Sequence, residues 1–199
     1  MKKLLLTALI AGMSAAPALA TPYVSGNVGV GFLGNSDASR LGITINDAIT
    51  YKSGIPFGIA VGVKEDRFRV EAAIGYQTND VEKEKRNLID LVSVSGDSIS
   101  FLTYMANCYY DINLNKSSVS PYVMVGIGGA SINAKIDTSD ETKSVFAWQL
   151  GAGVGVKAAN NLTVDLGYRY LKPSKFKDNY AEYTGSSSNI LAGIRYDFQ

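Results

Sequence analysis

The sequence predicts an all-β protein: an eight-stranded antiparallel up-and-down transmembrane β-barrel, preceded by a cleaved signal peptide. Segment after segment alternates apolar residues with polar residues or glycine at a period of two, which is the period of a β-strand. The chain combines 20 glycines with 12 tyrosines. Short and long connections between the segments also alternate strictly, as in bacterial membrane barrels.

The first twenty residues have the three parts of a secretory leader. Two lysines are followed by an uncharged apolar run from Leu4 to about Ala16, and Ala18-Leu19-Ala20 supplies a small-residue cleavage site. We expect cleavage between Ala20 and Thr21, so that residues 1–20 are the signal peptide and 21–199 the barrel domain. An uncleaved anchor is the alternative, although a spanning helix needs roughly 20 apolar residues.

Composition excludes several classes of function. Removing Lys2 and Lys3 leaves 17 of the 19 basic residues against 18 acidic ones, so nothing favours nucleic acid as a partner. Histidine is absent, which removes Ser-His-Asp, Cys-His and histidine–metal chemistry together. Cys108 is the single cysteine and cannot form an internal disulfide.

Period-two alternation defines eight expected strands. In "LTVDLGYRYLK", for example, Leu162, Val164 and Leu166 alternate with Thr163 and Asp165. Each segment has about the 9–11 residues that a tilted strand needs to cross a bilayer. The expected strands are residues 22–33, 54–64, 67–77, 99–112, 120–132, 145–157, 162–172 and 188–198.

One motif suggests a different fold. Gly29-Val-Gly-Phe-Leu-Gly34 matches the dinucleotide-binding pattern G-x-G-x-x-G. That motif needs a helix starting at the glycines, yet the following "NSDASRLGITINDAIT" has no convincing amphipathic helix. Gly29 and Gly31 fall in phase with the polar face of the first strand, so we interpret the match as a coincidence.

The two faces of the strands predict which side meets lipid. Charged residues on the polar face suit a crowded lumen, and aromatic residues near strand ends suit the interfacial girdles of a membrane barrel. A soluble lipocalin-like barrel, with its apolar face inside, is the less favoured alternative. The expected lumen charge cluster is Arg69, Glu71, Asp165, Arg169 and Arg195, and the expected girdle is Tyr110, Phe146, Trp148, Tyr168, Tyr170, Tyr196 and Phe198.

Four long polar connections are expected on one side of the barrel. They are residues 34–53, 78–98, 133–144 and 173–187. The second, with "EKEKR" followed by an apolar stretch, is predicted to form a short helix or to extend its hairpin above the membrane. These connections either contact a ligand or partner, or are simply solvated.

Five stretches carry a family resemblance: "YMANCYYDI" (104–112), "PYVMVGIGGA" (121–130), "FAWQLGAGVGV" (146–156), "NLTVDLGYRYLKPSKF" (161–176) and "NILAGIRYDF" (189–198). They resemble the surface-antigen (major surface protein) family of small outer-membrane barrels, related in style to the OmpA-like transmembrane barrel. The resemblance covers the chain from about residue 99 onward and is only general before it. It implies an eight-stranded barrel exposed on the surface of a Gram-negative cell, with variable loops.

The predicted function therefore lies in the loops of a surface antigen, an envelope structural protein or an adhesion-type protein. Eight strands enclose a lumen that side chains just fill, so we expect a plug of paired charges, with Glu71 and Arg169 as one pair. The alternative is a narrow porin-like channel gated by lumen ion pairs. No enzyme activity, cofactor or metal is predicted: Ser139-Asp140-Glu141 fits a solvated turn, and Cys108 fits a lipid-facing position.

The expected partners follow from the expected location. A bacterial outer-membrane protein contacts the lipid bilayer and the barrel-assembly machinery during insertion. An extracellular or envelope protein could bind the loops, while no nucleic acid is expected.

Overall fold

The computed structural model describes residues 20–34, 36–40, 43–85, 91–92, 98–114, 117–136, 139–174, 176–177, 182–184 and 186–198. The predicted signal peptide, apart from Ala20, lies outside these residues. Ala20 directly precedes the first strand, which begins at Thr21. Within the described residues, no helix has the length and apolar character required to span a membrane.

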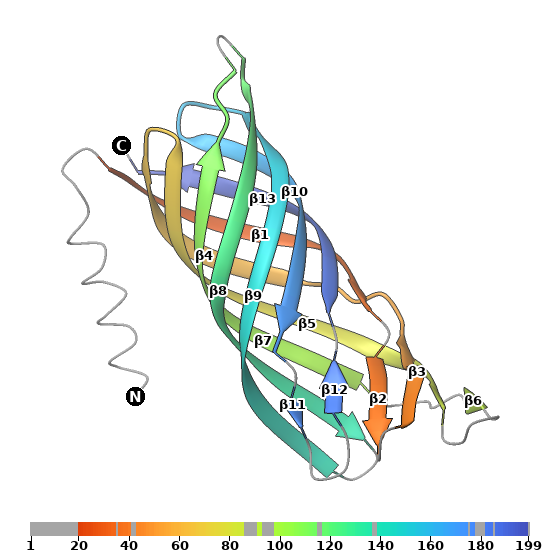
Figure 1. The fold of residues 1–199 in the computed structure, drawn as a ribbon. Coiled ribbons are helices and arrows are strands. Elements are labelled where there is room, and N and C mark those ends of the chain that lie inside the picture. Colours follow the sequence, from red (N-terminus) through yellow and green to blue (C-terminus); the bar gives the residue numbers. More distant parts are fainter. Residues whose placement is uncertain are drawn as a thin grey trace.

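Eight antiparallel strands form a closed barrel (Figure 1). Each strand pairs with its neighbour along the chain, and the first pairs with the last from Tyr23↔Asp197 to Leu33↔Ser187. Closure leaves no free edge in the wall, which a bilayer requires because lipid cannot satisfy backbone groups. The strands are β1 (Thr21–Leu33), β4 (Phe57–Glu65), β5 (Phe68–Lys85), β7 (Ser98–Asp111), β8 (Val119–Ile136), β9 (Ser139–Lys157), β10 (Leu162–Pro173) and β13 (Ser187–Asp197).

The two ends of the barrel differ. At one end, which we call the turn end, short connections join β4 to β5, β7 to β8 and β9 to β10 (Figure 1). The tightest is Asp66-Arg67, where Asp66 has a φ of 48°. Aspartate tolerates this left-handed conformation better than most residues do. The opposite end, the loop end, holds the long connections.

Strands continue into the segments that were predicted to be loops. β5, β8 and β9 run past the predicted boundaries, and five further strands lie in the long connections. Part of the 78–98 connection does extend its hairpin, because β6 pairs with the end of β5. The other added strands were assigned to loops, although Ile43, Ile45, Ile49 and Tyr51 share one period-two phase. The added strands are β2 (Ser36–Arg40), β3 (Ile43–Tyr51), β6 (Leu91–Val92), β11 (Phe176–Lys177) and β12 (Glu182–Thr184).

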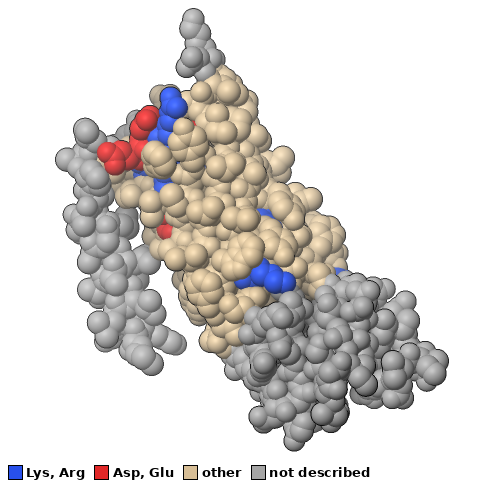
Figure 2. Space-filling view, in the orientation of Figure 1, with Lys and Arg blue, Asp and Glu red and all other residues tan. Residues whose placement is uncertain are grey.

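Apolar side chains cover the outer surface of the barrel wall. Leu166 on β10 is 55% exposed and Ile59 on β4 is 67% exposed, whereas their polar or small neighbours point inward. Figure 2 shows few charged side chains on the viewed face of the wall: acidic and basic groups gather near the turn end, and a basic group lies toward the loop end. This arrangement is opposite to that of a soluble ligand-carrying barrel, whose apolar face is inside.

The interior is filled unevenly. Glycines line the inner face of β9 and β10, and large side chains from β8 project toward them. The hydroxyl of Tyr122, for instance, lies against Gly153 and Gly167, where a Cβ atom would meet it. Near the loop end, Met105, Ala130, Ala147 and Leu171 form a small buried apolar cluster. The glycine-rich face that was predicted for "LGAGVGV" therefore provides room for side chains from the neighbouring strand β8.

Candidate functional site

A buried ion-pair network lies in the lumen near the turn end, and Asp111 on β7 is its centre. The guanidinium of Arg69 donates to Asp111 from Nε at 3.0 Å and from Nη2 at 2.8 Å. Lys64 Nζ lies 3.5 Å from the same carboxylate and Arg195 Nη1 lies 3.9 Å from it. Asp111 and Arg69 are both buried. Their pairing stabilises the fold, because either charge buried alone would carry a large desolvation cost.

Aromatic rings and a second carboxylate complete this network. The Arg69 guanidinium lies 4.2 Å above the ring of Tyr109, a cation–π geometry that fixes its plane. Arg195 Nε on β13 lies 3.5 Å from Asp165 Oδ2 on β10. An Arg–carboxylate pair between two lumen-facing strands therefore occurs, as the sequence analysis expected in kind.

Glu71 does not pair with Arg169, contrary to the specific expectation. Its Oε1 accepts hydrogen bonds from Asn107 Nδ2 at 2.9 Å and from the Tyr109 hydroxyl at 2.8 Å, and its Oε2 accepts one from the Tyr23 hydroxyl at 2.9 Å. Three neutral donors thus stabilise the carboxylate, so it needs no guanidinium contact. Gln149 extends this series of hydrogen bonds, because its Nε2 donates to Asn107 Oδ1 at 2.6 Å.

An uncharged hydrogen-bond network lies in the lumen near the loop end. Gln77 donates to Asn79 Oδ1 at 2.7 Å, and the Ser187 hydroxyl lies 2.9 Å from Gln77 Oε1. Asn79 in turn donates to the backbone carbonyl of Lys52 at 2.7 Å. The network links β5 and β13 to the segment that leads into β4, so it ties the loop-end connections to the barrel.

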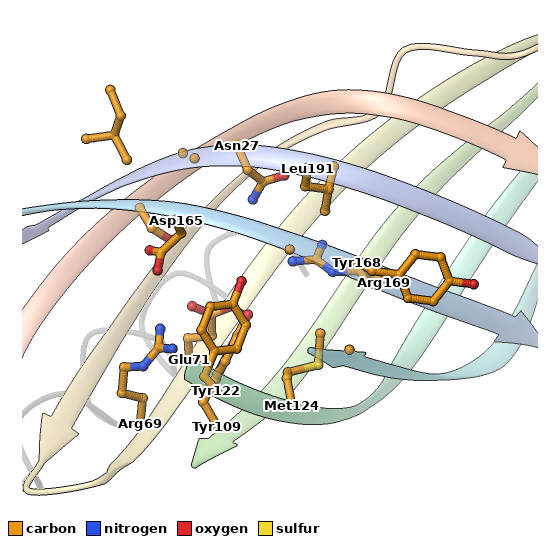
Figure 3. Close-up of a pocket in the computed structure, with 16 residues that line it drawn as sticks. Asn27, Arg69, Glu71, Tyr109, Tyr122, Met124, Asp165, Tyr168, Arg169 and Leu191 are labelled. Atoms are coloured by element: carbon orange, nitrogen blue, oxygen red, sulfur yellow. The ribbon is translucent and has the colours of Figure 1, made fainter. Parts of the chain in front are cut away.

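Two small cavities remain between the two networks. One, of about 50 Å³, is lined by Ser25, Arg69, Asp165 and Arg169 among others, and the second measures about 30 Å³. Arg169 lines both cavities, as do Asn27 and Leu191. Figure 3 shows the Arg169 side chain pointing into the larger cavity. Its buried Nε has no hydrogen-bond partner in the protein, and cavities of this size hold a few water molecules.

The predicted lumen residues all line the interior, but they are not one cluster. Arg69, Asp165 and Arg195 belong to the ion-pair network, Glu71 to its own hydrogen-bonded group, and Arg169 borders the cavities. Sequence reasoning did not single out Asp111 as the hub, and it missed Tyr23 and Asn107 as partners of Glu71. The period-two phase of β1 and β7 could have placed Tyr23, Asn107 and Asp111 on the lumen face. Phase alone does not show which lumen residues contact one another.

Aromatic residues form two belts around the outer surface. Near the turn end, the ring of Phe68 packs at a tilt against Tyr110 and that of Tyr196 packs edge-to-face against Phe198, with ring centroids 5.3 Å apart in each pair. Near the loop end, the rings of Trp148 and Tyr170 lie 5.9 Å apart. Of the seven predicted girdle residues, Tyr110, Tyr196 and Phe198 lie at the turn end and Phe146, Trp148 and Tyr170 lie toward the loop end, whereas Tyr168 lies near the middle of β10.

The described residues offer no metal site of three or more histidine, cysteine, aspartate or glutamate side chains. Cys108 is exposed on the outer surface, in the same outward phase as Tyr104 and Tyr110.

A closed antiparallel barrel with an apolar, aromatic-belted exterior and a polar interior is the architecture of bacterial outer-membrane β-barrels. The chain belongs to the outer membrane protein beta-barrel domain family, whose model matches residues 4–198. Proteins of this family and fold reside in the bacterial outer membrane, and this chain is an outer-membrane protein of that kind.

Two curated relatives share part of the chain. The outer membrane protein PagN of Salmonella typhimurium is 32% identical over 126 residues, covering 51% of this chain and 52% of PagN. The 25 kDa outer-membrane immunogenic protein of Brucella ovis is 32% identical over 89 residues, covering 45% of this chain and 38% of that protein. The chain thus spans about half or less of the length of these relatives.

A solved structure matches nearly the whole fold. Neisserial surface protein A superposes with a TM-score of 0.61 at 20% sequence identity, covering 90% of this chain and 99% of that protein. At this identity the likeness shows the shared fold.

Proposed function

We propose that this outer-membrane barrel acts at the cell surface through its loop end, as an adhesion-type or recognition protein, and that its lumen is a structural plug. The observation that carries the proposal is the contrast between the two regions. The described lumen is crossed by an ion-pair network and by an amide–hydroxyl network, whereas β2, β3 and the ends of β5, β8 and β9 build a sheet beyond the barrel.

The comparisons support a surface role without identifying a ligand. One relative carries "immunogenic" in its name and the structural neighbour is named a surface protein. Loops that project from a rigid barrel suit recognition, because they can vary without disturbing the scaffold.

Trimming the loop end tests this proposal. In one variant a two-residue turn replaces residues 36–49, in a second it replaces residues 134–141, and a third combines both changes. Gram-negative cells that display the wild-type protein should bind epithelial monolayers or matrix-coated plates, and the combined variant should lose this binding. Heat-modifiable migration confirms that each variant still forms a barrel. Equal binding by all displayed forms would contradict the surface role.

A narrow channel is the second candidate, favoured by the two cavities that meet at Arg169. Under this alternative, removing the Arg169 side chain joins the cavities and raises ion conductance. Single-channel recording of refolded wild type and Arg169→Ala in planar bilayers decides between the candidates. A plug predicts no resolved conductance steps in either protein, and a channel predicts steps that grow in the variant.

A further inference from the structure

A basic side chain lies on the outer wall at the level of the loop-end belt. Among the outward-facing wall residues whose side chains the structure describes, only Glu65 and Lys172 are charged. Glu65 is the last residue of β4, beside a turn, whereas Lys172 is the penultimate residue of β10. Lys172 has the outward phase, since Leu171 and Pro173 on either side of it are buried. Figure 2 shows a basic group on the viewed face of the wall toward the loop end.

Aromatic rings lie next to this lysine. Lys172 is directly opposite Trp148 on β9, and opposed side chains on one face of an antiparallel pair are close enough to interact. Tyr170 lies two residues earlier on the same face, and its ring centroid is 5.9 Å from that of Trp148. Such rings mark the membrane interface, where lipid headgroups begin. A lysine beside them can keep its aliphatic stem against the apolar wall while its ammonium reaches the headgroups.

Hydroxyl groups lie on the other side of β10. Ser188 on β13 is opposite Tyr170, and its Oγ lies 2.9 Å from the exposed hydroxyl of Tyr168. Serine and tyrosine hydroxyls can donate to a phosphate or sugar oxygen. We call Trp148, Tyr170, Lys172 and Ser188 the β10 patch. It brings a cation, hydroxyl donors and two aromatic rings together on three adjacent strands of an otherwise apolar wall.

We propose that the β10 patch binds the phosphorylated glucosamine headgroup of lipid A. The inference goes beyond the proposed surface function, because its partner is a lipid of the membrane that holds the barrel. Charge complementarity carries it: a basic side chain at headgroup level attracts anionic headgroups. The hydroxyls and rings of the patch suit the sugar to which the phosphate is attached. The long connections of such barrels face the outside, so the patch lies in the outer leaflet, which contains lipid A.

Trp148 provides the readout, because it is the single tryptophan of the chain and part of the patch. The full protein is refolded into vesicles of phosphatidylcholine with brominated acyl chains, which quench the indole on contact. Lipid A without bromine is then added, and the recovery of fluorescence gives its affinity relative to phosphatidylcholine. We expect a preference for lipid A of about fivefold or more, the scale for one lysine beside an anionic headgroup. Lipid A from which the phosphates were removed should show no preference.

Lys172→Gln removes the charge of the patch and should abolish the preference for lipid A, whereas Lys172→Arg should retain it. Lys157→Gln is the matched control. It makes the same change at an exposed lysine of β9, the strand that carries Trp148, but at the turn end. This variant should prefer lipid A as the wild type does. Heat-modifiable migration confirms that each variant forms a barrel.

Equal affinities for lipid A and phosphatidylcholine in the wild type would overturn the proposal. So would an unchanged preference in Lys172→Gln, which a lysine that merely reaches interfacial water predicts, or an equal loss in Lys157→Gln. Recovery by phosphatidylglycerol that equals recovery by lipid A would show that negative charge alone is selected, and would contradict the glycolipid assignment. The vesicles contain no loop ligand, so this proposal and the adhesion proposal can fail independently.

Discussion

Asp111 shows how a single buried side chain can organise one end of the lumen. Its carboxylate receives Arg69 through three hydrogen-bond contacts and lies within ion-pair distance of Lys64 and Arg195. Three cations from three other strands thus converge on one anion. The network gives the buried guanidinium groups a shared counter-charge and joins β4, β5, β7 and β13, while Arg195 Nε and Nη1 face carboxylates without a hydrogen bond.

Removing the Asp111 charge should destabilise the barrel. In Asp111→Asn, Arg69 and Arg195 remain buried while their shared counter-charge is lost. We expect a loss on the order of 3 kcal/mol in the free energy of unfolding, the scale for breaking a buried pair. Urea unfolding in lipid vesicles, followed by the fluorescence of the single tryptophan, Trp148, measures it. Asp197→Asn is the control, because Asp197 Oδ1 has no hydrogen-bond partner, and it should change stability little. Equal losses in both variants would refute the hub assignment.

At the scale of the strand, alternation sets the environment of each residue. On β10, Leu166 faces outward between Val164 and Tyr168, while Gly167 and Arg169 face the lumen. β10 therefore accommodates Arg169 on its lumen face, whereas an arginine on its outer face should destabilise the barrel.

Leu166→Arg should destabilise the barrel by about 2–4 kcal/mol, the range for a basic residue on the lipid face at the membrane midplane. Leu162→Arg is a matched control on the same face of the same strand. Leu162 pairs with Tyr196 in the turn-end belt, and near an interface the expected cost falls to about 0–1 kcal/mol. Vesicle unfolding curves give both values, and equal costs at the two depths would contradict the membrane position assigned to β10.

Gly167→Ala should destabilise through crowding inside the lumen. The added methyl group meets the Tyr122 hydroxyl and lies 3.3 Å from the Ala152 carbonyl. Overpacking of this kind typically costs about 1–3 kcal/mol. Combining it with Tyr122→Phe should recover part of the loss, because the clashing oxygen is gone. Gly26→Ala, whose Cβ would have no atom nearer than 3.9 Å, should be neutral. No recovery in the double variant would place the strain elsewhere.

The sequence predicted the elements well where lipid imposes one apolar face. All eight wall strands were predicted, and Phe57–Glu65 and Leu162–Pro173 lie close to their predicted ranges because alternation is enforced along the membrane span, whereas β5, β8 and β9 extend beyond theirs at the loop end. Above the membrane that constraint ends. Ile43–Tyr51 was assigned to a loop although Ile43, Ile45, Ile49 and Tyr51 share one phase, which Asp47 interrupts.

The contacts inside the lumen were less predictable than the faces. Period-two phase placed Arg69, Glu71 and Arg169 inside, but the partner of each depends on strand register and tilt across the barrel. Register brings Glu71 opposite Asn107, whose amide donates to its carboxylate, and places Arg169 opposite Gly151 and Asn189. Neither register can be read from one strand alone.

At the scale of the whole molecule, the barrel separates a short-turn end from an extended loop end. The wall is apolar and belted by aromatic rings, the lumen is crossed by two polar networks, and the projecting strands are joined to the loop end. A functional surface at the loop end requires that this end faces the outside of the cell and the turn end faces the periplasm.

Site-directed labelling of intact cells tests this orientation most directly. In a Cys108→Ser background, Lys52→Cys places a thiol at an exposed loop-end position, and Asn160→Cys places one at an exposed turn-end position. A membrane-impermeant maleimide should label the Lys52→Cys protein on intact cells. It should label the Asn160→Cys protein only after the outer membrane is permeabilised. Labelling of the turn end alone on intact cells would contradict the account.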